Sequence, residues 1–262
     1  MKFGMPTLIE ASELERCAAL CGELGLNFIE LNMNMPQYQL GVLDEKRAIE
    51  IAQWYDLFYT LHLDENLNVC DFNPYIAQGY RRTVMESIAL AKRMDIPVLN
   101  MHMHSGVHFT LPEKKVHLFE VYKDRYLSDM RTFRDACEEA IGDADVILCV
   151  ENCDGFTAFQ REAIDLLMES PVFALTFDVG HNHSCSGKDE AFVVAHSGRL
   201  IHMHLHDALG KKNHLALGTG ELDAVKYLRL AQEKACRVVL ETKTIAGLRE
   251  SVRWTKEKGW MD

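Results

Sequence analysis

The chain has 262 residues, which is enough to bury a sizeable core in one large domain or in two small ones. Its composition is ordinary for a globular protein, with 48% hydrophobic and 26% charged residues. The formal net charge of −11 argues against nucleic acid and anionic membranes as partners, because both attract clustered lysine and arginine.

The targeting and cysteine signals point to the cytoplasm. The first ten residues, MKFGMPTLIE, lack the long apolar run of a signal peptide, and no segment approaches the roughly 20 apolar residues that span a membrane. The eight cysteines include no C-x-x-C pair, and Cys149 lies inside an apolar run. We therefore expect mostly reduced, packed cysteines and a cytoplasmic location.

Short apolar runs alternate with helical patterns along the whole chain. The runs predict strands at residues 2–6, 28–33, 58–63, 98–104, 146–152, 173–179, 200–206 and 237–242. Ser12 and Glu15 have the spacing of a capping box at the start of the first helix. The predicted apolar face of that helix comprises Leu14, Cys17, Ala18, Cys21 and Leu24.

Eight strand–helix units in about 250 residues are typical of one α/β domain, the (β/α)8 TIM barrel. An open doubly wound sheet is the competing fold, and it normally carries a glycine-rich turn after its first strand. The segment that follows the first predicted strand here, TLIEAS, contains no glycine. We therefore predict a single TIM-barrel domain over residues 1–262.

Ionisable side chains stand at the carboxyl ends of most of these strands, where TIM barrels place their chemistry. They are Glu30, His62, His102, His104, Glu151, Asp178, His181, His202, His204, His206 and Glu241. Carboxylates that converge in an apolar setting repel one another unless a cation joins them. Imidazole and carboxylate together are the ligands of Zn²⁺, Mn²⁺, Co²⁺ or Fe²⁺, so the group predicts a metal site.

Each of these residues taken singly has a plainer interpretation, since a lone histidine in a strand is more often a hydrogen-bonded core residue. The metal prediction therefore rests on the whole group. Other polar residues are interpreted as ordinary surface or packing residues, namely Cys153, Asp154, His108, His117 and His196.

The strand-end motifs resemble those of the xylose isomerase-like barrels, a family that includes sugar and sugar-phosphate isomerases and epimerases and also endonuclease IV. The resemblance covers the whole chain. Its most specific parts are Glu151 in CVEN, Asp178 in FDVGH, His204 in HLHD and Glu241 in LETK. The resemblance implies that these four residues hold one divalent metal ion, Zn²⁺, Mn²⁺ or Co²⁺.

The endonuclease branch of this family binds further zinc ions. The resemblance to that branch implies a second metal held by residues from His62, His104, His181 and His214. Where that branch has an Asp-x-His motif, this chain has Lys212-Asn213-His214. A lysine beside a cation adds repulsion, which argues against a complete third metal site.

The leading hypothesis is a metal-dependent isomerase or epimerase of a sugar, a sugar phosphate or a related polyol. It would remove a proton next to a carbonyl held by the metal and pass through an enediolate. Glu151 and Glu241 would act as acid and base. Substrate contacts are assigned to His181, His206, Lys243 and Phe156, although His206 is equally well a loop residue and Lys243 a solvated one.

Three alternatives stay open. One is an endonuclease IV-like zinc phosphodiesterase, which the extra histidines favour and the acidic loops around the mouth oppose. The others are a metal-dependent dehydratase and a barrel that only binds a sugar. The expected partner is a small carbohydrate, without nucleic acid or membrane, and a homo-oligomer is compatible with the sequence.

Overall fold

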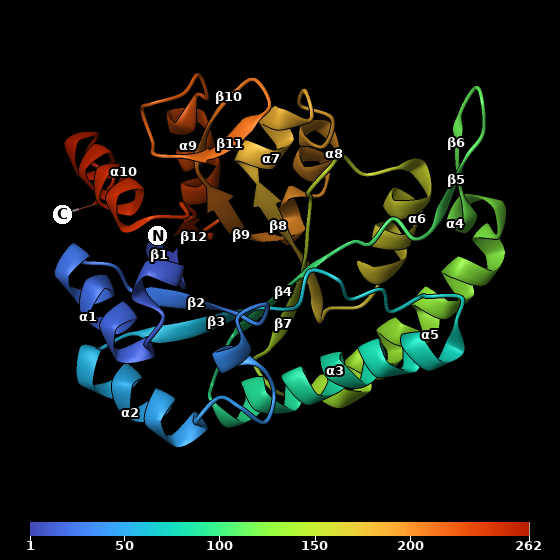
Figure 1. The fold of residues 1–262 in the computed structure, drawn as a ribbon, viewed down its shortest axis with the longest axis horizontal. Helices are drawn as coiled ribbons and strands as arrows, with labels where there is room; N and C mark the ends of the chain where they lie inside the picture. Colours follow the sequence, from blue (N-terminus) through green and yellow to red (C-terminus); the bar gives the residue numbers. More distant parts are fainter. Residues whose placement is uncertain (262) are drawn as a thin grey trace.

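The computed structural model describes residues 1–261 and confirms the TIM barrel (Figure 1). Eight parallel strands close in the order β1-β12-β9-β8-β7-β4-β3-β2. The strands are β1 (Lys2–Pro6), β2 (Phe28–Asn32), β3 (Phe58–His62), β4 (Val98–His102), β7 (Ile147–Glu151), β8 (Phe173–Asp178), β9 (Leu200–Leu205) and β12 (Arg237–Leu240). Each overlaps one of the eight predicted runs, because short β-branched and apolar runs between helical patterns suit buried parallel strands.

Helices connect successive strands. They are α1 (Leu14–Leu24), α2 (Glu45–Tyr55), α3 (Pro74–Arg93), α4 (Leu118–Val121), α5 (Lys123–Ile141), α6 (Ala158–Leu167), α7 (Val179–Ser184), α8 (Glu190–Ala195), α9 (Ala224–Glu233) and α10 (Ile245–Glu257), with short 3₁₀ turns η1 (Ile9–Ala11), η2 (Pro36–Tyr38) and η3 (Ser197–Arg199). Within residues 1–261, no helix combines the length and the apolar character that crossing a membrane requires.

Two small hairpins stand outside the barrel. One pairs β5 (His108–Thr110) with β6 (Lys115–His117) and projects away from the barrel, and the other pairs β10 (Asp207–Leu209) with β11 (Lys212–Leu215) (Figure 1). They follow β4 and β9 respectively, so both rise from the carboxyl-terminal side of the barrel. The sequence prediction did not include either hairpin.

The predicted capping box at the first helix is wrong. Ser12 follows η1 with helical backbone angles of φ −64° and ψ −31°, whereas an N-cap residue needs an extended backbone. Glu13, at φ −74° and ψ 128°, takes the N-cap position, and α1 begins at Leu14 without a side-chain cap. The predicted apolar face is largely correct, with Cys17, Ala18, Leu20, Cys21 and Leu24 buried.

The apolar core lies mainly between the barrel and its helices. A separate small cluster of Val98, Cys149 and Ala174 comes from three adjacent strands, β4, β7 and β8. Two residues further along the same strands stand Asn100, Glu151 and Thr176, on the same face because side chains alternate along a strand. This face therefore turns from apolar to polar toward the carboxyl ends of the strands.

Strand register sets the partners of the polar groups. Asp178 of β8 lies opposite His204 of β9, and His204 lies opposite Val239, two residues before Glu241. On the other side, His102 of β4 lies opposite Glu151 of β7. The closed register brings residues from distant parts of the chain to one end of the barrel.

Candidate metal centre

Four buried side chains at the ends of neighbouring strands converge on one point. Glu151, Asp178, His204 and Glu241 each offer a ligand atom, and these atoms all lie within 4.8 Å of one another. Nδ1 of His204 lies 3.0 Å from Oε1 of Glu151, 3.2 Å from Oε2 of Glu241 and 4.0 Å from Oδ2 of Asp178. Ligands around a tetrahedral ion with bonds near 2.1 Å lie about 3.4 Å apart, so the spacing suits a small divalent cation.

The charges in this group also suit a cation. Three carboxylates surround one imidazole. Although burial opposes its protonation, the charges of Glu151, Glu30 and Glu241 raise the pKa of His204 well above its ordinary value. Oε2 of Glu241 is buried and, although it lies 3.2 Å from Nδ1 of His204, accepts no hydrogen bond among the described residues. A divalent ion at this point would replace the proton of His204 and satisfy that oxygen, so the residues fit a bound metal.

Both carboxylates at the flanks of the group are held ionised. Burial is the largest single influence and acts to raise the pKa of Glu151 and of Glu241, but the charges and hydrogen bonds of neighbouring basic groups, His204 foremost, together outweigh it and place both pKa values well below the usual range. His102 contributes in the same direction to Glu151, and Lys243 does so to Glu241, where its Nζ lies 2.8 Å from Oε1.

Glu30 of β2 supports His204 from the far side of the ring. Its Oε1 lies 2.8 Å from Nε2 of His204, while Oε2 lies 2.9 Å from Nε2 of His202 and accepts a hydrogen bond from Thr60 at 2.9 Å. All four side chains are buried, with exposures of 2% or less. The carboxylate thus fixes the ring that turns Nδ1 toward the three ligand carboxylates.

Glu151 faces two groups of imidazoles. Its Oε1 belongs to the four-residue group, whereas Oε2 lies 3.4 Å from Nε2 of His62 and 3.4 Å from Nε2 of His102, and also accepts a hydrogen bond from Asn100. His62, His102 and Glu151 form a second set of atoms spaced for a metal. Burial would lower the pKa of His62, but Glu151 raises it to about 9.

A third group consists of His181, His206 and His214. Nε2 of His181 lies 3.2 Å from Nε2 of His214, and Nε2 of His206 lies 3.1 Å from Asp178. His206 has no exposed surface, so it reaches the site through Asp178 and not from an open cavity. Lys212, which stands where the endonuclease branch has the aspartate of its Asp-x-His motif, is exposed on β11 and takes no part in this group. The third side chain of the group is His206.

Backbone contacts explain how the imidazoles of the third group approach so closely. A Cβ at Gly180 would overlap the ring of His206, so only glycine leaves room for it between α7 and β9. Asp207, with 1% exposure, accepts hydrogen bonds from four backbone N–H groups of the loop that carries His214. Its partners are Ala208, Gly218, Gly220 and Leu222. Asp207 therefore organises the loop, and it belongs to none of the metal-spaced groups among residues 1–261.

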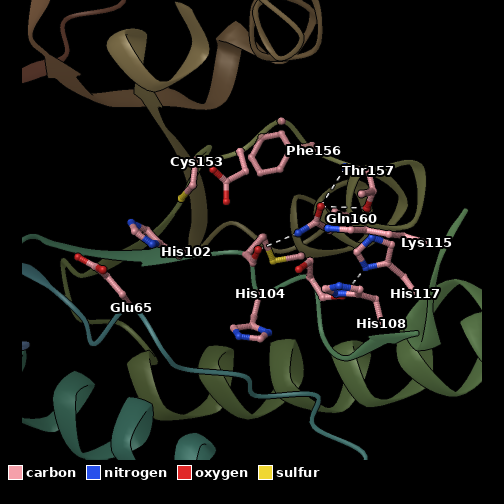
Figure 2. Close-up of a pocket in the computed structure, with 14 residues that line it drawn as sticks. Glu65, His102, His104, His108, Lys115, His117, Cys153, Phe156, Thr157 and Gln160 are labelled. Atoms are coloured by element: carbon pink, nitrogen blue, oxygen red, sulfur yellow. Dashed lines mark hydrogen bonds between the residues drawn. The ribbon is translucent and has the colours of Figure 1, made fainter. Parts of the chain in front are cut away.

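Two hollows flank the four-residue group. The first, of about 270 Å³, is the mouth hollow, and among its lining residues are Glu30, His62, Glu241 and Lys243. The second, of about 450 Å³, is the hairpin pocket, which extends from His102 to the β5–β6 hairpin (Figure 2). Glu65 lines both hollows.

The structure distributes the sequence-predicted residues among these features. The four residues of the expected primary site lie together, but His62, His104, His181 and His214 do not. His62 joins His102, and His181 and His214 join His206, whereas His104 faces the hairpin pocket with its Nδ1 accepting a hydrogen bond from Gly106.

Among the residues assigned to substrate, Lys243 lines the mouth hollow and Phe156 lines the hairpin pocket. The site assignments from the sequence did not include Glu30 or His102, although both stand at strand ends. His108, His117, Cys153 and Asp154, interpreted from sequence as surface or packing residues, line the hairpin pocket.

Comparison with known proteins agrees with the fold. The family model described as xylose isomerase-like TIM barrel matches residues 18–258. An uncharacterized protein of Methanocaldococcus jannaschii, MJ1614, is 26% identical over 209 residues, which cover 76% of this chain and 77% of that protein.

Two solved structures are similar over nearly their whole length. A D-tagatose 3-epimerase-like protein has a TM-score of 0.80 and 23% identity, covering 98% of this chain and 96% of its own. The 3-keto-D-glucoside 4-epimerase YcjR of E. coli has a TM-score of 0.77 and 14% identity, covering 98% and 99%. At these identities the likeness shows the fold alone. The family model spans most of the chain, and the protein belongs to the xylose isomerase-like TIM-barrel family.

Proposed function

We propose that the protein is a divalent-metal-dependent isomerase or epimerase of a sugar, a sugar phosphate or a related polyol. The observation that carries the proposal is the convergence of Glu151, Asp178, His204 and Glu241 beside the mouth hollow, where one buried carboxylate oxygen accepts no hydrogen bond. Support also comes from structural neighbours whose names identify them as sugar epimerases or proteins like them.

These four residues would hold the metal ion, and their mixture of one imidazole and three carboxylates suits zinc, manganese or cobalt. When bound, the ion would supply a fixed positive charge that stabilises negative charge developing on substrate oxygens. Glu30 keeps the ring of His204 oriented for this role.

Glu151 and Glu241 are the proposed proton-transfer residues. Glu151 ends β7 and Glu241 directly follows β12, with β8 and β9 between these strands in the closed barrel, so the two residues border the site from two sides. Their low pKa values keep both ionised at neutral pH, as accepting a proton requires. One carboxylate would take the proton from the carbon next to the carbonyl and later release it to solvent. The other would first take up a proton from solvent and then return it to the opposite face of the substrate.

Two further side chains would position the substrate. Lys243, in the mouth hollow, would contact a substrate oxygen with its Nζ, which also holds Oε1 of Glu241. His181, whose Nδ1 lies 3.2 Å from the carbonyl oxygen of Cys153, would contact a second substrate oxygen through its ring.

The test is solvent exchange. Ketoses, ketose phosphates and keto-polyols would be incubated with metal-loaded protein in deuterated water, and deuterium next to the carbonyl would be followed by NMR. Shortening Glu151 or Glu241 to Asp should keep metal binding but slow exchange by about a hundredfold, since a displacement near 1 Å costs that much. A product that has lost water would instead assign the protein as a dehydratase.

A second candidate function is an endonuclease IV-like phosphodiesterase. The observation in its favour is that Glu151 places one carboxylate oxygen on each of two metal-spaced groups, with a third group beside Asp178. Two-metal sites of this kind suit phosphodiester hydrolysis. Against it stands the net charge of −11, because a nucleic acid-binding face is normally basic.

Metal counting separates the two candidates. Elemental analysis of purified protein should give one ion per chain under the first proposal and two or three zinc ions under the second. Cleavage of DNA containing an abasic site, without isotope exchange in any ketose, would replace the isomerase proposal with the hydrolase.

A further inference from the structure

We propose that the hairpin pocket binds an anionic group, a phosphate or a carboxylate, carried by the substrate at the end opposite its reacting carbonyl. The identity of the substrate as a carbohydrate rests on the proposed function, but the anion site does not. The proposal rests on the position of the pocket, the charges along its walls and the hydrogen bonds that fix one of those walls.

The pocket begins at the metal centre. His102 lines it and also places Nε2 3.4 Å from Oε2 of Glu151. From there the pocket runs to the β5–β6 hairpin, where Lys115, His108 and His117 form its far side (Figure 2). Its volume of about 450 Å³ lies in the range of small-molecule sites. A molecule held at Glu151 can therefore extend its far end to the hairpin.

Basic and acidic residues occupy different ends of the pocket. Glu65 lies at the end near His102, as Figure 2 shows. Asp154, the other lining carboxylate, directly follows Cys153, which Figure 2 places at the same end as His102. The hairpin contributes only basic lining residues, so the far end suits a negative charge.

Lys115 is the central residue of that far end. Lys115 is exposed and lines the pocket, and none of the ion pairs or side-chain hydrogen bonds of residues 1–261 involves its Nζ. Lys243, by contrast, is paired with Glu241 at 2.8 Å. An ammonium group that lines a pocket without a protein partner is available to a ligand anion.

Two imidazoles stand beside this lysine. His108 and His117 lie opposite each other in the hairpin register, with ring centroids 5.4 Å apart. Nδ1 of His117 lies 3.3 Å from the carbonyl oxygen of Ser105, which must accept the bond, so this nitrogen carries the proton. That contact fixes the ring and leaves Nε2 as the acceptor nitrogen, which can take a hydrogen bond from the hydroxyl of a monoprotonated phosphate group.

Hydrogen bonds within the protein fix the wall of the pocket that lies opposite the hairpin. Gln160 of α6 is 5% exposed, and its Nε2 donates to the carbonyl oxygen of Met103 at 2.7 Å while Oε1 accepts from the backbone N–H of Thr157 at 2.9 Å. This bond ties the segment after β4 to the start of α6. The N-terminal turn of α6 thus faces the pocket through Thr157 and adds partial positive charge.

The first experiment measures binding of inorganic phosphate by calorimetry at equal metal loading. The variant is Lys115→Met, and Lys114→Met is the matched control, because Lys114 belongs to the same hairpin loop and does not line the pocket. We expect Lys115→Met to weaken phosphate binding about tenfold and Lys114→Met to leave it unchanged. Lys115→Arg should retain binding. Equal affinities in Lys115→Met and Lys114→Met would overturn the proposal.

The second experiment compares a ketose phosphate, a keto sugar acid and a neutral ketose as substrates. Lys115→Met should raise KM about tenfold for the anionic substrate that the pocket takes, without lowering kcat, and leave the neutral ketose unaffected. Comparing the ketose phosphate with the keto sugar acid shows whether the pocket binds a phosphate or a carboxylate. An equal effect on all three substrates would contradict the inference. If no substrate turns over, the proposed function fails while phosphate binding still decides the anion site.

Discussion

Oε1 of Glu30 lies 2.8 Å from Nε2 of His204, on the opposite side of the ring from the nitrogen that faces three carboxylates. The two residues come from β2 and β9, which are not neighbours in the barrel, so the contact crosses its interior. A carboxylate in this position both orients an imidazole ligand and increases its basicity.

Replacing Glu30 with Gln should weaken binding of zinc or manganese by about 10–100-fold. The amide keeps the shape of the side chain but removes the charge that His204 faces. Affinity would be measured by competition with a chromophoric chelator, with Thr60→Val as a control that removes one hydrogen bond to Glu30 and keeps its charge. Wild-type affinity in Glu30→Gln would mean that Glu30 has no influence on the metal.

Metal removal should destabilise the fold, because three carboxylates then share one site with only the proton of His204 between them. At a metal concentration about 100 times Kd, the ion should add about 2.7 kcal/mol to stability and roughly 5–10 °C to Tm. Differential scanning calorimetry with and without chelator measures this shift. The double variant Asp178→Asn, Glu241→Gln should show no such shift, and a full shift in it would contradict the ligand assignment.

The metal-free protein should lose stability as the pH rises from about 6.5 to 9. The pKa of His62 is raised to about 9 in the folded chain by Glu151, above the value of about 6.5 expected when unfolded. Protonated His62 therefore favours the folded state, fully below pH 6.5 and no longer above pH 9. The contribution is on the order of 3 kcal/mol at most. Urea titrations in chelator would show it, and His62→Gln should flatten that part of the profile; an unchanged slope would exclude His62 as the cause.

Gly180→Ala should destabilise the protein by roughly 1–3 kcal/mol, because the new methyl group overlaps the ring of His206. Displacement of that ring also removes the contact of His206 with Asp178, so metal affinity should fall as well. Gly198→Ala is the matched control, since a Cβ there meets no atom within 4 Å. Thermal unfolding and metal titration of both variants test the prediction, which fails if they behave alike.

Much of the fold was predictable because each barrel strand is a short apolar run and each helix has its own periodicity. The grouping of Glu151, Asp178, His204 and Glu241 was also accessible, since all four stand at strand ends and match family motifs. The role of Glu30 could not be predicted from the sequence, because it depends on which residues face each other across the barrel interior. His102 and His104 alternate as in one strand, but β4 ends at His102, so the chain turns and carries His104 elsewhere.

The hydrogen bonds of Asp207 determine which substitutions the loop after β9 can accept. It holds the course of the loop after β9 through backbone N–H groups alone, which every residue except proline supplies. Two of these partners must stay glycine, because a Cβ at Gly220 would overlap Ala208 and Asp207 itself, and Gly218 has a φ of +84° with the ring of Trp254 against it. Other side chains on the loop, such as the exposed Lys211 and Lys212, can be exchanged without altering its shape. Descendants of this sequence can therefore acquire new specificities at the barrel mouth while the scaffold beneath stays constant.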